Sequence, residues 1–322
     1  MSAVRPGPSV KGTMQEGRAT ANEASDGDRR GARLRLVSEV IWRTTQFFHE
    51  EGITQLLPVM LGRSTDPLGP DPGSSVIATA EIDYLGDRFY LMNSMILHKQ
   101  FAVRELGPIW ILSPNVRLER PERGASGKHL FEFTQADFEL PRARGADVRA
   151  LVERYFVHLG RTLHDCAAFS TLDVKPPRFF PPWPVYTTHE LAGRYGPDWE
   201  AAASRDHDQP FWALCHRREF YDREDPDAPG HFLNYDLVYP DGYGEALSGA
   251  EREWESDRIR HRIARDGIPP AAFRAYLDRA QGLIPSAGAG FGVERLVRFL
   301  SRAAHVGDVQ LFRRVPGERA EL

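Results

Sequence analysis

The sequence predicts an α+β domain in which an antiparallel β-sheet is flanked by helices. Strand-like runs occur in blocks separated by helical patterns, and the runs at 109–120 and 129–140 are typical of a hairpin. No regular alternation of strand and helix is present, which disfavours a parallel sheet. With 322 residues and a hydrophobic content of 41%, the chain is long enough to bury a substantial core.

The first elements follow from apolar spacing. Residues 1–33 carry almost no large apolar side chains, so we expect a disordered tail ahead of one folded domain at 34–322. From Leu36 to Phe48 the apolar residues have helical spacing, and Gly52 predicts the end of that helix. The run 53–61 is strand-like but contains Pro58, which lacks a backbone donor. This strand is therefore expected at an edge or an interface.

The remaining elements are predicted from the same patterns, and the proline-rich stretch 174–184 is expected to cross the surface. In chain order they are strands near 76–84 and 88–92, a helix near 95–106, the hairpin 109–120 and 129–140 with its polar loop 120–128, helices near 145–168 and 188–195, strands at 211–220, 231–239 and 243–249, and helices at 250–266 and 269–281.

Composition narrows the class of protein. The net charge of −4 disfavours a dedicated nucleic-acid binder. The two cysteines, Cys166 and Cys215, have no metal-ligand spacing and are expected to be reduced thiols. No apolar run has the length of a membrane span or a signal sequence. We therefore expect a soluble, cytoplasmic protein with no membrane partner.

The stretch 286–300, SAGAGFGVERLVRFL, predicts a phosphate-binding junction between a strand and a helix. Gly288, Gly290 and Gly292 are spaced by two, so they share one strand face where a flat ligand or a phosphate can approach the backbone. Arg295 falls in the first turn of the helix that follows, where free N–H groups favour anions. The alternative is a packing strand whose glycines allow close contact with a helix.

The hairpin carries a second cluster of polar residues. Alternation places Arg117 and Glu119 on one strand face, and across the hairpin it aligns Phe133, Gln135 and Asp137. An exposed sheet face could carry the same residues. However, an arginine, carboxylates and an aromatic ring together offer what a nucleotide triphosphate needs: charge for the phosphates and a plate for the base.

In their order along the chain, these segments resemble the three signature motifs of class II aminoacyl-tRNA synthetases. The three are 53–61 with Pro58, the hairpin VRLER…KHLFEFTQADFE, and the glycine strip ending in GVERL. YLMNSMILHKQ (90–100) and GEALSGAER (244–252) are similar to the amino-acid pocket and metal segments of the aspartyl/asparaginyl branch. The resemblance covers residues 34–322.

The resemblance implies an ATP site. Arg117 would grip the α-phosphate and Arg295 the γ-phosphate, which makes these two arginines the expected catalytic residues. The other implied ATP-binding residues are Glu119 at the adenine edge, Phe133 on the ring, His129 near the outer phosphates, and the backbone at Gly290 and Gly292. Mg²⁺ would be held by Asp236, Glu245 and Ser248, since magnesium takes few protein oxygens and completes its shell with phosphate and water.

The resemblance also implies aspartate as the amino acid. Lys99 and Arg252 match the cations that aspartate-specific members use for the side-chain carboxylate, and Asp137, with Gln135, would hold the ammonium. Taken without the family, Lys99 would be expected to be a solvated helix lysine.

Two departures set this chain apart from the tRNA ligases of the branch. Its 33 residues before the predicted domain are too few for their anticodon-binding barrel, so no anticodon recognition is expected. Ahead of the glycine strip, Pro285 is followed by Ser286 and Ala287, where those ligases usually have Pro-His. A catalytic core without that barrel resembles the archaeal-type asparagine synthetase, and the phrases LLPVML, SPNVRLE and SAGAG are also similar to that subgroup.

This similarity implies an AMP-forming ligase that adenylates aspartate, at the β-carboxylate, and passes it to ammonia to give asparagine. The alternatives are transfer to another amine or a carrier, and a non-catalytic synthetase-like partner. The exposed strand with Pro58 and the long apolar helix face further predict a homodimer. The identity of the amine and the choice of carboxylate are not decided by the sequence.

Overall fold

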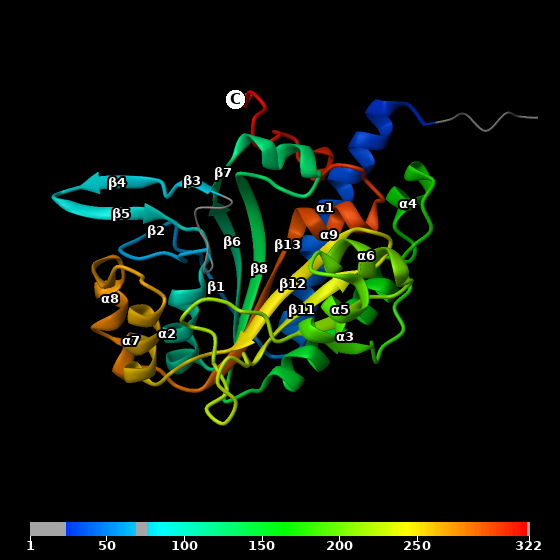
Figure 1. Ribbon diagram of the computed structural model, residues 1–322. Coiled ribbons are helices and arrows are strands. Elements are labelled where there is room, and N and C mark those ends of the chain that lie inside the picture. The colour runs from blue at the N-terminus through cyan, green and yellow to red at the C-terminus, as the bar shows by residue number, and fades with distance from the viewer. Residues whose placement is uncertain (1–23, 69–75, 321–322) are drawn as a thin grey trace, which may run out of the picture.

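A large β-sheet forms the centre of the computed structural model (Figure 1). Within the described residues, 24–68 and 76–320, this sheet has eight strands in the order β1-β6-β8-β13-β12-β11-β10-β9. The bounds are β1 (Thr54–Leu56), β6 (Ile109–Val116), β8 (Glu132–Pro141), β13 (Ser286–Gly292), β12 (Gly244–Glu251), β11 (Asn234–Tyr239), β10 (Phe211–Leu214) and β9 (Val185–Thr187). The strands from β6 to β10 pair antiparallel, whereas β1 and β9 add parallel pairs at the two edges. The predicted α+β class is confirmed.

Three helices, α1 (Asp26–Glu50), α3 (Gly145–Thr162) and α9 (Val293–Leu300), share the main hydrophobic core with the sheet. Phe48 of α1 stacks on Trp110 of β6 at 5.0 Å between ring centroids, and on its other side lies Tyr155 of α3, at 6.1 Å. Burying these large rings removes much apolar area from water and fixes α1 and α3 against the sheet.

The N-terminal boundary of the fold differs from the prediction. Helix α1 begins at Asp26, so residues 26–33 are helical, while residues 1–23 of the predicted tail lie outside the described residues. Ser25 caps the helix: its side chain accepts from the backbone N–H of Asp28, whose carboxylate accepts from the backbone of Ser25. Ala32 is fully buried in the core. Neither the small Ala32 nor the capping box of Ser25 and Asp28 adds a large apolar side chain, so apolar spacing did not predict this first part of the helix.

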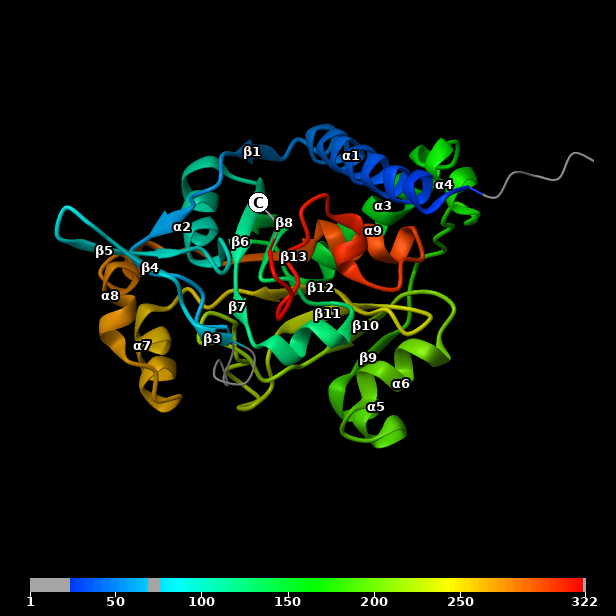
Figure 2. The same ribbon diagram turned by 90° about the horizontal axis from the view of Figure 1, so that it is seen from above.

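The remaining elements lie at the two ends of the sheet (Figure 2). One end carries α2 (Ile96–Leu106), α7 (Ser256–Arg265), α8 (Arg274–Leu277) and the short strands β2 (Leu61–Gly62), β3 (Val76–Ala78), β4 (Glu81–Tyr84), β5 (Asp87–Leu91) and β7 (Leu118–Glu119). The other end carries α5 (Thr188–Tyr195) and α6 (Trp199–Asp206), and α4 (Ala167–Leu172) packs against α1.

Several predicted elements are shorter than expected, each for a local reason. The run predicted as one strand at 53–61 is interrupted after β1, because Pro58 cannot continue a ladder, and Leu61 begins β2. The strand at 211–220 ends after Leu214, where Cys215 takes a positive φ of 70°. The predicted helix 269–281 is broken into α8 and two 3₁₀ segments, Pro270–Phe273 and Ala280–Gly282. Helix α6 was not predicted.

The predicted homodimer can be tested at the exposed apolar residues near β1. Trp42 is 59% exposed and Leu57 is 91% exposed, and β1 is an edge strand of the sheet. We expect sedimentation at micromolar concentration to give a dimer, and Leu57→Glu to give a monomer, because a charge in an apolar interface is costly to desolvate. Leu85→Glu, at the equally exposed turn between β4 and β5, is the matched control. A wild-type monomer would refute the prediction.

Within the described part of the chain, no helix combines the length and the apolar character needed to cross a membrane.

Candidate active site

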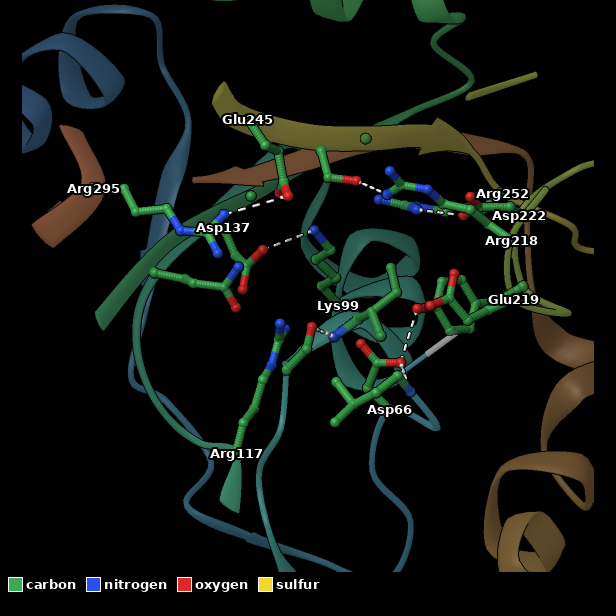
Figure 3. Close-up of a pocket in the computed structure, with 18 of the residues that line it drawn as sticks. Asp66, Lys99, Arg117, Asp137, Arg218, Glu219, Asp222, Glu245, Arg252 and Arg295 are labelled. Carbon is green, nitrogen blue, oxygen red and sulfur yellow. Dashed lines mark hydrogen bonds and ion pairs between the residues drawn. The ribbon is translucent and has the colours of Figure 1, made fainter. Parts of the chain in front are cut away.

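A cavity of about 320 Å³ opens on the sheet at β8, β12 and β13 (Figure 3). A smaller recess of about 80 Å³ adjoins it and shares Arg117, Glu119 and Arg295 with it. All but one of the predicted site residues line one of these two spaces. Phe133 and Gly292 line the recess only, and Asp236 lines neither.

Arg117 and Phe133 lie together in the recess. The Arg117 guanidinium stands 5.2 Å from the centroid of the Phe133 ring, and its Nε donates to the Asn93 carbonyl at 3.1 Å. Glu119 forms an ion pair with Arg123 at 3.7 Å. Burial raises the pKa of the Glu119 carboxyl, opposed by the nearby arginines, with Arg117 first. The arrangement puts a cation, a ring and a carboxylate within one small space, as a nucleotide site requires.

Arg295 is held at the start of α9 and faces the cavity (Figure 3). Its Nε donates to the Lys128 carbonyl at 3.0 Å, and Nη1 lies 3.3 Å from Glu245 Oε2. Burial alone would raise the pKa of Glu245, but Arg295 and Arg218 outweigh it and lower this pKa to about 2. Glu245 is therefore ionised at neutral pH, and its side chain stays 37% exposed.

His129 lines both spaces but carries no charge at neutral pH. Burial, followed by the neighbouring Arg295 and Arg123, lowers its pKa to about 3. As a neutral imidazole it can exchange one hydrogen bond with an outer phosphate, but it cannot add positive charge there.

The glycine strip has two different uses. Gly288 pairs with Glu139 and Gly290 with Asp137 across β13 and β8. A Cβ at Gly288 would meet Glu139 Oε2 at 2.2 Å, and one at Gly290 would meet Asp137 Oδ1 at 2.1 Å. Gly288 thus makes room for a buried carboxylate and does not line the cavity, whereas Gly290 also lines it. Close packing applies to Gly288, but against strand β8 and not against a helix as the alternative had it.

Lys99 is buried, with 1% of its surface exposed, so the expectation of a solvated lysine is wrong. Its Nζ lies 3.2 Å from Asp137 Oδ1 and 3.5 Å from Glu139 Oε2. Arg252 reaches the same acid from the other side: its Nε lies 3.2 Å from Glu139 Oε1. Glu139 also accepts from the Ser286 hydroxyl at 2.8 Å. Two buried cations therefore stand at the deep end of the cavity, bridged by one carboxylate.

Asp137 lies beside Lys99, and Gln135 lines the same cavity. Asp137 is 3% exposed, and its Oδ2 has no hydrogen-bond partner among residues 24–68 and 76–320. Gln135 is held in place because its Oε1 accepts from Asn115 at 2.7 Å. Asp137 is thus a buried acceptor at the wall of the cavity with one oxygen left for a donor.

The predicted magnesium ligands are only partly brought together. Glu245 and Ser248 line the cavity, and both fit a cation that completes its shell with phosphate and water. Asp236 instead accepts from Arg218, and His216 Nε2 lies 3.4 Å from Asp236 Oδ2. Arg218 also donates to the Ser248 hydroxyl. Asp236 Oδ1 is buried without a partner in the described residues. The described residues hold no group of three or more Asp, Glu, His or Cys arranged for a metal.

The cavity is also lined by residues that were not predicted from the sequence, among them Asp66, Glu219, Tyr221 and Asp222. Asp222 binds Arg252 Nη1 at 3.1 Å, and Tyr221 donates to Asp66 at 2.9 Å. The signal for Glu219, Tyr221 and Asp222 was the charged run HRREFYDRED at 216–225, whose beginning was interpreted as part of a strand, whereas Asp66 lies outside this run. This run follows no strand alternation, because the chain leaves the sheet after Leu214.

An antiparallel sheet that presents an arginine–glutamate strand, a glycine strip and an arginine on the following helix defines a class II synthetase core. The chain belongs to this family: the family model described as "tRNA synthetases class II (D, K and N)" matches residues 26–316. The resemblance stated from the motifs is thereby confirmed at the level of the family and of its aspartyl/asparaginyl branch.

The relatives are asparagine–tRNA ligases. The Pyrococcus abyssi protein is 27% identical over 305 residues, which are 88% of this chain and 68% of that protein. The Thermococcus kodakarensis protein is 30% identical over 254 residues, which are 71% of this chain and 58% of that protein. The chain thus spans about three fifths to two thirds of the length of these relatives.

The solved structures agree on the fold. Asparaginyl-tRNA synthetase from Pyrococcus horikoshii, complexed with asparaginyl-adenylate, superposes with a TM-score of 0.76 at 24% identity, over 90% of this chain and 70% of that one. The Entamoeba histolytica enzyme, also with asparaginyl-adenylate, gives 0.76 at 21% identity, over 88% of this chain and 67% of that one. Both confirm the synthetase fold.

Proposed function

We propose that this protein is an ATP-dependent, AMP-forming ligase that adenylates aspartate at its β-carboxylate and transfers the aspartyl group to ammonia, giving asparagine. The family supports ATP use, and the solved relatives named above hold an aminoacyl-adenylate. The observation that carries the choice of aspartate is the pair of buried cations, Lys99 and Arg252, at the deep end of the cavity.

A carboxylate is the ligand that fits these cations best. Lys99 Nζ lies between 3.2 and 3.5 Å from two carboxylate oxygens and two carbonyl oxygens. Charge-assisted hydrogen bonds are usually about 2.7–2.9 Å long, so none of these contacts is at full strength. A substrate carboxylate oxygen would replace the longer of the two contacts between Lys99 Nζ and a carbonyl, which is 3.4 Å to the carbonyl of Ala289. Because the β-carboxylate must reach ATP, these two cations would hold the α-carboxylate. Asparagine has no second carboxylate to attack ATP, so a dicarboxylate such as aspartate is the substrate that fits both ends.

The first step would need positioning and charge more than a nucleophilic side chain. An aspartate carboxylate oxygen attacks the α-phosphorus, and the bond to pyrophosphate breaks. Arg117 would bind the crowded α-phosphate, and Arg295 the departing pyrophosphate. Glu245 and Ser248 would hold Mg²⁺, which neutralises phosphate charge when bound. Asp137 Oδ2 would accept from the substrate ammonium and so orient the amino acid.

In the second step ammonia attacks the acyl carbon of the mixed anhydride, and AMP leaves. Ligation to tRNA is the second candidate, because the relatives are named as asparagine–tRNA ligases. Against it, two cations of the loop at 120–128 are already neutralised in the described structure. Arg123 pairs with Glu119, and Lys128 pairs with Glu200 at 3.0 Å.

One experiment tests the acceptor. The protein is incubated with ATP, Mg²⁺ and labelled aspartate, with either ammonium or total tRNA added. We expect free asparagine and AMP with ammonium alone, unchanged by ribonuclease, because no tRNA is needed for an amine to attack an acyl-adenylate.

The other outcomes each select an alternative. Label on tRNA would select the tRNA ligase. Pyrophosphate exchange without asparagine would select another amine or a carrier, which a panel of amines analysed by mass spectrometry would identify. No exchange at all with aspartate or asparagine would select a non-catalytic partner.

A further inference from the structure

Four residues from distant segments form a closed network of contacts beside the cavity. Glu200 Oε1, in the first turn of α6, lies 3.0 Å from Lys128 Nζ. The Lys128 carbonyl accepts from Arg295 Nε at 3.0 Å, and Arg295 Nη1 lies 3.3 Å from Glu245 Oε2 (Figure 3). The network closes at Glu245, whose backbone N–H donates to Glu200 Oε1 at 3.3 Å.

Glu200 reaches this network from outside the site. It lines neither the cavity nor the recess, whereas Arg295 and Glu245 line both spaces and Lys128 lines the recess. Arg295 and Glu245 are the residues proposed above for the departing pyrophosphate and for Mg²⁺. One carboxylate behind the site therefore contacts both sides of the end where the outer phosphates would lie.

The backbone before Glu245 leaves room for this carboxylate. Gly244 has a φ of 75°, a conformation that residues with a side chain rarely adopt. A Cβ at Gly244 would lie 2.7 Å from Glu200 Oε1 and 3.4 Å from Lys128 Nζ, so a side chain there would displace the Glu200 carboxylate. The absence of a Cβ thus allows Glu200 to contact Lys128 and the Glu245 N–H together.

A second side chain fixes helix α6 against the same turn. Ser204 is fully buried; its hydroxyl donates to the Tyr239 carbonyl at 2.7 Å and accepts from the Gly244 N–H at 3.1 Å. Ser204 follows Glu200 by four residues, so both lie on one face of the helix. Two polar side chains of α6 therefore bind the turn between β11 and β12, and the position of Glu200 is set by the fold.

A surface ion pair would account for only one of these contacts. The side chains of Lys128 and Glu200 are 36% and 37% exposed, and ion pairs of this kind contribute little to stability. Such a pair explains neither the contact with the Glu245 N–H nor the space at Gly244. The effect of Glu200 is therefore expected in the geometry of the site and not in the stability of the fold.

We propose that Glu200 is a positioning residue for the adenylation step, which orients Arg295 through the Lys128 carbonyl and holds Glu245 through its backbone N–H. This inference rests on the proposed adenylation of aspartate. When the anchor of Lys128 is removed, its carbonyl is less restrained, and Arg295 loses the acceptor that aims its guanidinium at the departing pyrophosphate. Because preorganised donors supply much of the rate, a small displacement is costly.

The test measures which constants change in Glu200→Ala. Because aspartate would bind at Lys99, at the deep end of the cavity, its KM should stay within about 2-fold of wild type. The maximal rate of aspartate-dependent pyrophosphate exchange should fall by about 10- to 100-fold, the cost of misplacing a reacting group by about 1 Å. Calorimetry with ATP and Mg²⁺, without aspartate, should show binding about 10-fold weaker, as expected for one weakened charge-assisted hydrogen bond.

Three companion variants make the result specific. Glu200→Gln keeps an oxygen that can accept from both donors, so it should restore most of the exchange rate lost in Glu200→Ala. Adding Lys128→Ala to Glu200→Ala should slow exchange little further, because both changes break the same route to Arg295. Asp208→Ala, at an exposed acid just beyond α6, is the control and should match wild type. All variants should melt within about 3 °C of wild type.

Other results would overturn the inference. Exchange at the wild-type rate in Glu200→Ala would do so, and faster exchange with tighter ATP binding would show that Glu200 holds Lys128 away from ATP. A lower melting temperature with an equal rise in the KM values for ATP and aspartate would show a structural role. Full additivity in the double variant would contradict the route through Lys128. Absence of exchange in the wild type would refute the proposed function, and calorimetry with ATP would then still test Glu200.

Discussion

Replacing Arg295 with alanine is expected to abolish aspartate-dependent exchange of pyrophosphate into ATP while the protein still folds. Arg295 lies in the first turn of α9, and its guanidinium reaches the cavity between the Lys128 carbonyl and Glu245. A donor aimed at charge that develops in the transition state contributes about 100- to 1000-fold in rate. The proposed target is the outer phosphate that leaves as pyrophosphate.

The fold should tolerate this change, because the Arg295 side chain is 27% exposed and its ion pair with Glu245 faces the cavity. The pair is only partly exposed, but water in the cavity can solvate Glu245 once the guanidinium is gone, so the loss should be smaller than for a fully buried pair. Arg302→Ala, just beyond the same helix, removes an exposed arginine paired with Asp241 and is the matched control. Unfolding of Arg295→Ala, or exchange at the wild-type rate, would contradict the assignment.

Lys99→Met is expected to abolish exchange and also to destabilise the protein. The change removes the only cation paired with Asp137 in the described residues and leaves Glu139 to Arg252. Removing one partner of a buried ion pair costs about 3–5 kcal/mol, because the remaining charge has lost its counter-ion. Denaturant unfolding measures this loss. Lys175→Met, at an exposed lysine, should change neither property.

A double variant separates recognition from stability. Lys99→Met with Asp137→Asn removes both members of the pair, so part of the lost stability should return. Exchange should remain absent, because the aspartate carboxylate would still lack its buried cation. Exchange restored in the double variant would show that Lys99 acts only through the fold.

The pattern of the sequence was sufficient to predict the antiparallel sheet and to group Arg117, Glu119 and Phe133, which line one recess. Local periodicity predicts strands and helices. Arg117, Glu119 and Phe133 lie within one hairpin, whose register follows from the alternation of its residues. Boundaries were less certain where a single residue decides them. Cys215 ends β10 through a positive φ, and Ser25 starts α1 through a cap, and neither belongs to an apolar pattern.

The deep end of the cavity depends on contacts between residues far apart in the chain. Lys99, Glu139 and Arg252 come from α2, β8 and the end of β12, and Gly288 of β13 leaves the space that Glu139 fills. A lone lysine on a helix has the same local pattern whether it is solvated or buried, so only the packing of these four elements shows its burial.

The same reason explains why the sequence did not predict Asp66 and Glu219 as residues of the cavity. Each lies in an irregular segment with no periodicity, and their position on one cavity appears only in the fold. Local sequence patterns were thus sufficient to predict the sheet, the glycine strip and the family. The charge balance of the cavity was decided by the tertiary structure, because Coulomb interaction and desolvation depend on distance in space and on burial.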